Sequence, residues 1–233
     1  MAKLTTAKER TTARLPMRRA GHVRFRKLLD ATESLVAEMS IQDVGLSQIA
    51  ERAQVPTASV YHFFPTKEAA LLALAAEHHD ILQRIAREEL RPPPQTWQEL
   101  VRRKVLQSTT HYNEHPAALR LFLSAGITVE LRTAEITQTM VLAEIRANLL
   151  NHYFDMPPVR DWVRRLATSI AIVDGICILS YSQFGYLTPE FMEDAHSASV
   201  AYLRTFLPER IERRQTPETP KHAVLQDPKE KIA

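Results

Sequence analysis

The hydrophobic residues of the N-terminal third recur at the spacing of amphipathic helices. Between residues 23 and 39 they form one apolar stripe of a helix, at Val23, Leu28, Leu29, Leu35, Val36 and Met39. Short helices are predicted over residues 46–53 and 56–63, since Pro56 suits the first turn of a helix. Thr66 can cap a fourth helix, which the pattern extends from Lys67 to about Leu90.

Prolines divide the remainder of the chain into further helices. The run at 92–94 is the clearest break, and helices are predicted over residues 97–114, 116–126, 131–153, 161–181 and 189–206, with Thr96 and Thr188 as caps. The helix over 161–181 is apolar nearly all round, which is typical of helices buried on several sides. From Pro208 onward the chain is polar and proline-rich, so we expect a disordered tail. The sequence thus predicts an all-α fold, and its five glycines agree with few turns.

Positive charge is concentrated at the N-terminus, although the formal net charge is only +3. Nine basic residues precede Asp30 and only Glu9 opposes them: Lys3, Lys8, Arg10, Arg14, Arg18, Arg19, Arg24, Arg26 and Lys27. Such a segment suits a polyanion such as DNA. For the part before Arg18, a solvated and disordered tail is an equal alternative.

Cysteine content and hydropathy indicate the cellular location of the protein. Cys177 is the only cysteine, so no intrachain disulfide can form, which suits a reducing cytosol. The N-terminus lacks the apolar stretch of a secretory signal. The most apolar segment, residues 170–179, contains Asp174 and is shorter than the ~20 residues of a membrane span. We therefore expect a cytoplasmic protein without a membrane segment.

The segment from Gly45 to Lys67, GLSQIAERAQVPTASVYHFFPTK, predicts a helix-turn-helix. Its two short helices cannot bury their own apolar faces, so the helix over residues 23–39 must cover them. In such a unit the second short helix lies in the major groove of DNA.

This segment resembles the TetR family of transcription regulators. The resemblance rests on Leu29-Asp30-Ala31 with Leu35, on Ile49-Ala50-Glu51-Arg52-Ala53 with Val55, on Ser59-Val60-Tyr61-His62-Phe63, and on Pro65-Thr66-Lys67-Glu68-Ala69 with Leu71-Leu72. It covers about fifty residues, whereas the C-terminal part matches only in its helical layout. Three positions depart from the family: Gln54 replaces a turn glycine, Phe63 replaces a histidine, and Gly45 replaces a threonine.

The resemblance implies a basic arm over residues 1–20 and a DNA-binding domain over 21–82. A ligand-binding and dimerisation domain follows over 83–207, and a tail over 208–233. The candidates for contact with DNA are Ser47, Thr57, Ala58, Ser59, Tyr61, His62 and Lys67. Hydroxyl, phenol and imidazole groups can bond phosphates or base edges, and Ala58 can pack on a thymine methyl. The charge of Lys67 opposes the dipole of the helix that it begins, so a phosphate explains it better than helix stability.

The resemblance also implies a ligand cavity in the C-terminal domain. Its candidate residues are Trp97, Val101, Val105, His111, Tyr112, Leu119, Phe122, Met140, Ile145, Trp162 and Leu166, for each of which ordinary core packing is the simpler interpretation. Asp174 differs, since an acid within an apolar helix must be paired, protonated or functional. We expect pairing with an arginine, and contact with a polar ligand or across a dimer seam as the alternative.

A homodimer is expected from the last two long helices, which carry more apolar surface than a monomer would expose. The interface candidates are Ile172, Val173, Ile176, Leu179, Val200 and Leu203. A two-fold dimer would place two recognition helices ~34 Å apart, matching successive major grooves of a palindromic operator. The expected function is a transcriptional regulator, in the family's manner a repressor released from operator DNA by a small-molecule effector, with no cofactor and no resident metal.

Two other functions remain open. His111-Tyr112-Asn113-Glu114-His115 matches the H-x-x-E-H signature of zinc proteases, which needs both histidines on one helical face. Pro116 disfavours the helical conformation at His115, so the helix should end there, and we do not expect an enzyme. Phe63 and Gln54 leave open a helical interaction protein that has lost DNA binding.

Overall fold

The described part of the protein is helical. The computed structural model describes residues 12–124 and 128–214, which contain nine helices and no strand. They are α2 (Arg19–Glu38), α3 (Leu46–Ala53), α4 (Thr57–Phe63), α5 (Lys67–Arg87), α6 (Trp97–Glu114), α7 (Pro116–Leu123), α8 (Val129–Tyr153), α9 (Trp162–Phe184) and α10 (Pro189–Arg204). The predicted all-α fold is confirmed, and the helices begin and end within a few residues of the predicted positions. None of these helices combines the length and hydropathy needed to cross a membrane.

Local capping explains where several helices begin. The predicted caps Thr66, Thr96 and Thr188 each accept a hydrogen bond from the backbone N–H three residues later. At the other end of α9, Gly185 adopts a left-handed conformation with φ of 76°, which ends the helix.

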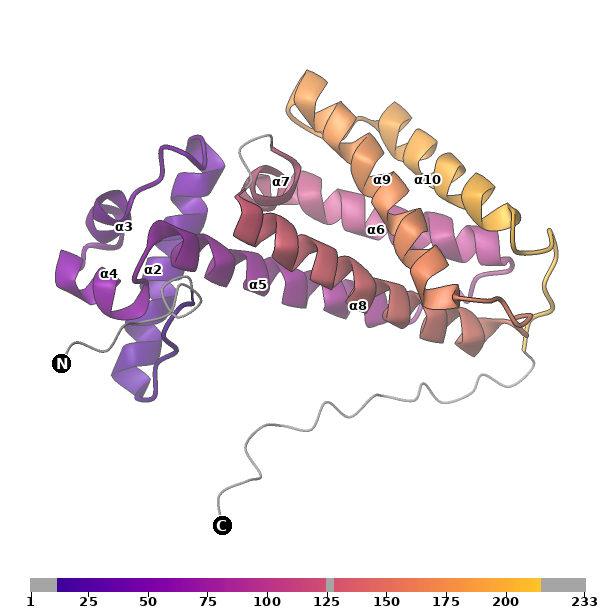
Figure 1. The fold of residues 1–233 in the computed structure, drawn as a ribbon, viewed down its shortest axis with the longest axis horizontal. Coiled ribbons are helices and arrows are strands. Elements are labelled where there is room, and N and C mark those ends of the chain that lie inside the picture. The colour runs from indigo at the N-terminus through magenta and orange to yellow at the C-terminus, as the bar shows by residue number, and fades with distance from the viewer. Residues whose placement is uncertain (1–11, 125–127, 215–233) are drawn as a thin grey trace, which may run out of the picture.

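The helices form an N-terminal unit and a C-terminal bundle that α5 connects. Figure 1 shows α2, α3 and α4 grouped at one end, and α5 running from this group into the bundle alongside α8. Leu71 and Leu74 of α5 are buried in its N-terminal half, and Leu82 is buried in its C-terminal half. One helix therefore contributes to the cores of both units. Helices α9 and α10 lie side by side on the outer side of the bundle.

Two predicted boundaries are wrong. Helix α2 already begins at Arg19, so the arm is shorter than residues 1–20; residues 1–11 lie outside the described residues. The predicted disordered tail begins too early, because residues 208–214 run along the bundle. There the Pro208 carbonyl accepts a hydrogen bond from Trp97 Nε1 at 3.0 Å, and Arg214 N–H donates to the Tyr153 carbonyl. The rest of the predicted tail, residues 215–233, lies outside the described part of the chain.

Candidate nucleic-acid interface and ligand cavity

Helix α4 presents one polar face to solvent. Thr57, Ala58, Tyr61 and His62 are exposed, and this spacing places them together on one side of the helix. Val60 and Phe63 point the other way and are buried. Tyr61 keeps 55% of its surface exposed, so its ring and hydroxyl are accessible from solvent. The predicted DNA-contact residues of α4 thus share one accessible surface, except Ser59, which is half-buried.

Aromatic packing holds α4 in place. The ring of Phe25 on α2 lies 5.7 Å from that of Phe63 and 5.3 Å from that of Phe64, measured between centroids. Phe63 is therefore a core residue. Its contact with Phe25 accounts for a phenylalanine at the position where the family has a histidine. The carbonyl of Phe63 also accepts a hydrogen bond of 2.8 Å from the backbone of Arg14, which ties the N-terminal segment to the end of α4.

The turn between α3 and α4 adopts the conformation that usually favours glycine. Gln54 has φ of 55° and ψ of 46°, in the left-handed region. Its backbone N–H caps α3 by donating to the Ala50 and Glu51 carbonyls. This turn therefore keeps its shape without glycine, at a cost of up to ~1 kcal/mol. At the start of α3, the Gly45 N–H donates to Gln48 Oε1 at 2.7 Å, which forms one half of a capping box; glycine has no hydroxyl to form the other half.

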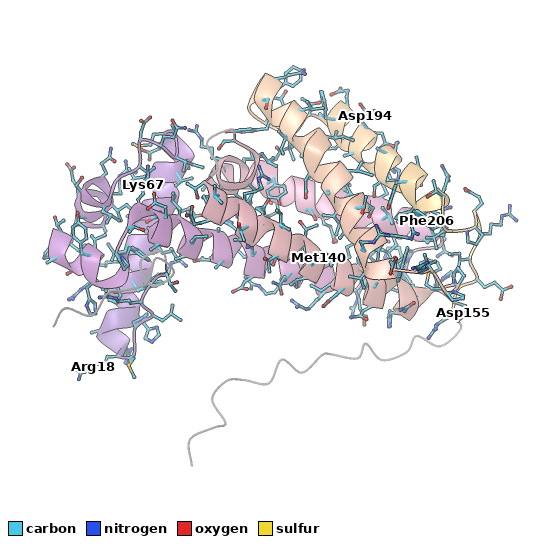
Figure 2. All side chains as sticks on the ribbon, in the orientation of Figure 1. Arg18, Lys67, Met140, Asp155, Asp194 and Phe206 are labelled. Carbon is cyan, nitrogen blue, oxygen red and sulfur yellow. The ribbon has the colours of Figure 1, made fainter. Side chains whose placement is uncertain are left out.

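Lys67 and Ser47 lie at two further helix starts. Ser47 is exposed in the first turn of α3. The Lys67 ammonium donates to the Gln42 carbonyl at 2.9 Å, a contact that the sequence did not predict. An ammonium has three donors, so two stay available for another acceptor. Figure 2 shows Lys67 and Arg18 on the N-terminal unit, away from Asp194 and Phe206 at the far end of the bundle.

The basic residues of the N-terminal unit fall into two groups. Arg26 pairs with Asp30 and Glu77, and Arg52 pairs with Glu38, so these cations serve the fold. Arg18, Arg19, Arg24 and Lys27 are exposed at the start of α2. The positive charge that a polyanion could meet therefore lies mainly at this end of α2.

A cavity lies among α5, α6, α8 and α9. Its apolar walls come from Leu82, Leu142, Leu149, Ile170 and Val173. Its polar lining comes from Lys104, Ser108, Thr109, Tyr112, Arg146 and Asp174. The centre of a water molecule can occupy about 50 Å³ of the cavity, which is room for a few waters at ~10–15 Å³ each.

The two charged groups deepest in the cavity are not paired with each other. Arg146 Nη1 is buried without a hydrogen-bond partner, and among the described residues no ion pair within 4.0 Å involves Asp174. The predicted arginine pairing of Asp174 is therefore wrong in this structure. Burial, reinforced by Glu135, raises the pKa of Asp174 to about 7. Burial lowers the pKa of Arg146 to about 10, against the attraction of Asp174.

Unlike Arg146, Lys104 has hydrogen-bond partners. Its side chain is buried, and the ammonium donates to the Ile85 and Glu88 carbonyls at 2.8 and 2.7 Å. These carbonyls belong to the end of α5, where a cation is favoured. Burial lowers the pKa of Lys104 to about 8. Lys104 therefore fastens α5 to α6 beside the cavity.

The structure separates the predicted cavity residues into three groups. Val105, Tyr112 and Asp174 line the cavity. Met140 is exposed on α8, and Trp162 is half-buried. The others are core residues that do not line it: Trp97, Val101, His111, Leu119, Phe122, Ile145 and Leu166. Arg146 and Lys104 also line the cavity and were not among the predicted residues. A usable signal was the position of Arg146 between Leu142 and Leu149 on the apolar side of its helix.

Comparison with known protein families gives a match for the N-terminal unit. The sequence model of the bacterial regulatory proteins of the tetR family matches residues 28–74, which include α3 and α4. Residues 28–74 are therefore similar to the N-terminal domain of the tetR family. A comparison with curated proteins finds no significant match.

Solved structures of TetR-family proteins share the whole fold. A TetR-family transcriptional regulator from Streptomyces coelicolor superposes with a TM-score of 0.65 at 21% identity, covering 81% of this chain and 99% of that one. SmeT, the repressor of the Stenotrophomonas maltophilia multidrug efflux pump SmeDEF, superposes with a TM-score of 0.58 at 18% identity, covering 84% of this chain and 94% of that one. A TetR regulator from Rhodococcus sp. RHA1 gives 0.57 at 20% identity, with 79% and 96% covered. The N-terminal domain and C-terminal bundle are therefore arranged in the TetR manner.

The predicted dimer residues divide into a buried group and an accessible group. Val173, Val200 and Leu203 are buried within one protomer, so their apolar character needs no partner, and their contact across a dimer stays a prediction. Leu179 is 54% exposed, and Ile172 and Ile176 are half-buried. Beside them, Ala171 and Gly175 of α9 and Ser197 and Ala201 of α10 are exposed. We call these small residues, together with Leu179, the α9–α10 face.

Three histidines meet where α5, α6 and α7 join. The ring centroids of His111 and His115 are 4.1 Å apart, and that of His78 lies 5.8 and 5.9 Å from them. His78 Nε2 is 3.5 Å from Glu33 Oε1 on α2 without hydrogen-bond geometry. Helix α6 ends at Glu114, as predicted from Pro116. Within the described residues, no group of three or more His, Cys, Asp or Glu residues is placed to hold a metal ion.

These histidines make stability depend on pH. Burial, aided by the charge of His115, lowers the pKa of both His78 and His111 to about 4. The unfolded chain takes up these protons near pH 6.5 and the folded protein only near pH 4, so their contribution is complete above pH 6.5 and is lost as the pH falls. We expect each histidine to lower the free energy of unfolding by about 2 kcal/mol between pH 7 and pH 5.

Chemical denaturation at both pH values measures this loss. The double variant His78→Leu, His111→Leu should be less sensitive to acid than the unaltered protein. The matched control is His22→Leu, at an exposed histidine of α2, which should retain the full sensitivity. Equal sensitivity of all three proteins would contradict the assignment.

Proposed function

We propose that this chain is a transcriptional regulator that binds operator DNA as a homodimer and responds to a small molecule. The observation that carries the proposal is the outward face of α4, with Thr57, Ala58, Tyr61 and His62 exposed on a helix whose other side is anchored in the core. An exposed helix of this kind can enter the major groove and offer donors to phosphates and base edges. Exposed Arg18, Arg19, Arg24 and Lys27 at the start of α2 would add attraction for the DNA backbone.

A homodimer follows from the α9–α10 face. Gly175 lies in the middle of α9, where glycine costs about 1 kcal/mol relative to alanine. A Cβ atom at Gly175 would meet nothing within 4 Å in its own protomer, so packing within the protomer does not require glycine. Close approach of a second protomer would explain it, since small side chains let helix backbones approach each other. Ala171, Ser197 and Ala201 are small in the same way.

The response to a ligand would pass through α5. This helix begins at Lys67 beside the DNA-facing region and contributes Leu82 and Ala86 to the cavity. The cavity has room for a few waters, so a larger molecule must displace the surrounding helices. Displacement of α5 would alter the spacing of the two recognition helices in a dimer. By linkage, ligand and operator must then weaken each other's binding by the same factor.

Salt-dependent binding to the DNA upstream of the protein's own gene tests the DNA-binding part. We expect the logarithm of the association constant to fall linearly and steeply with the logarithm of salt concentration, because Lys and Arg displace counterions from phosphates. Fluorescence anisotropy of the labelled fragment measures the slope. Absence of binding at low salt would favour the alternative of a helical interaction protein.

A further inference from the structure

Among the described residues, one cation of the cavity has a buried nitrogen without a hydrogen-bond partner. Arg146 reaches the cavity from α8, between Leu142 and Leu149, and Nη1 has no hydrogen-bond partner although it is buried. A buried guanidinium donor that lacks an acceptor is costly, and folded proteins rarely leave one unsatisfied. No described residue supplies the acceptor, so a bound molecule that brings one would satisfy this donor.

The charges around Arg146 favour an anion as that group. Lys104, the other cation of the cavity, already donates to two carbonyls. Asp174 is the one carboxyl group of the lining and forms no ion pair within 4.0 Å with any described residue. With all three groups charged, the lining carries a net charge of +1, which one monoanion would neutralise. A carboxylate matches the planar fork of a guanidinium and can accept two parallel hydrogen bonds from it.

The remaining walls favour an apolar body. Leu82, Leu142, Leu149, Ile170 and Val173 provide the apolar part of the lining, which suits a hydrocarbon chain.

We propose that the cavity binds a small organic acid, with its carboxylate on Arg146 and its hydrocarbon part among the leucine, isoleucine and valine side chains. This proposal rests on the proposed function, because it names the chemical class of the effector to which the regulator responds.

Asp174 gives this site a dependence on pH. Arg132, Glu135 and Arg146 of α8 act on it electrostatically, Lys104 and Tyr112 line the same cavity from α6, and Cys177 is its neighbour on α9. Because Asp174 ionises near pH 7, a bound carboxylate meets a neutral acid below this pH and a second negative charge above it. Affinity for an acid should therefore fall as the pH rises through 7, whereas affinity for a cation should rise.

Three probes with one hydrocarbon chain test the proposal: hexanoate, hexylammonium and 1-hexanol, titrated into the full-length protein by calorimetry without DNA. We expect hexanoate to bind at least about tenfold more tightly than the other two at pH 6, and to lose about tenfold in affinity by pH 8. Tighter binding of hexylammonium, or no binding of any probe up to its solubility, would overturn the proposal.

Two variants locate the binding. Arg146→Met keeps the length of the side chain and should make hexanoate and 1-hexanol bind alike. The same substitution at exposed Arg164 of α9 is the matched control and should preserve the preference. The variant Asp174→Asn should still bind hexanoate, and its affinity should decrease much less above pH 7 than that of the unaltered protein. Thermal unfolding of each variant shows that it is folded, and a preference for hexanoate that survives Arg146→Met contradicts the site.

The outcomes also separate this proposal from the proposed function. If hexanoate binds through Arg146 but leaves operator binding unchanged, the assigned ligand class stands and the regulatory role of the cavity fails. If hexylammonium releases the protein from DNA and hexanoate does not, regulation stands and the assigned class fails.

Discussion

The double variant Tyr61→Ala, Lys67→Ala is expected to bind its best DNA fragment at least about 100-fold more weakly than the unaltered protein. Tyr61 is exposed on α4 with its phenol available as a donor, and Lys67 keeps two donors beyond its bond to the Gln42 carbonyl. Contacts of this kind are each worth about 1–3 kcal/mol, and a two-fold dimer loses every one of them twice. Fluorescence anisotropy at fixed salt measures the loss.

Controls separate this effect from a general loss of charge or of folding. Arg87→Ala removes an exposed cation at the far end of α5 and should leave the affinity nearly unchanged. Tyr61→Phe removes only the hydroxyl, so it divides the effect of Tyr61 between the hydroxyl and the ring. Thermal unfolding should show both alanine substitutions to be tolerated, since neither side chain is in the core. If the double variant binds DNA as tightly as the unaltered dimer, α4 is not the recognition helix.

Gly175→Arg is expected to convert the dimer to monomers. In the isolated protomer the new side chain has open space, so the protomer should remain folded. Across a dimer seam of small residues, an arginine would hold the facing helices apart and bury a charge without a partner, which costs several kcal/mol. Sedimentation velocity measures the oligomeric state directly.

The matched control is Asn148→Arg, which introduces the same charge at an exposed position of α8 outside the α9–α10 face and should leave the dimer intact. The Gly175→Arg monomer should also lose most of its DNA affinity, because it can engage only one half-site. A Gly175→Arg protein that sediments as a dimer would show that the protomers meet elsewhere.

Local sequence patterns determined the helices and the DNA-facing residues of α4. The boundaries follow from caps such as Thr66 and Thr96, whose hydroxyls bond an N–H three residues away, and from prolines such as Pro116. The outward side of α4 follows from helical periodicity, since burial of Val60 and Phe63 leaves Thr57 and Tyr61 in solvent. These features depend on neighbours within one or two turns, which a sequence contains explicitly.

The contacts between distant segments were decided only by the tertiary structure. Periodicity identified Val173, Val200 and Leu203 as apolar-face residues, but whether such a face meets its own protomer or another depends on how the helices pack. For the same reason Arg146 and Asp174 came into one cavity without pairing, and residues 208–214 joined the bundle through Trp97 and Tyr153. A helical pattern specifies which side of a helix is buried, whereas the partner and the polar groups left unsatisfied depend on the arrangement of all helices together.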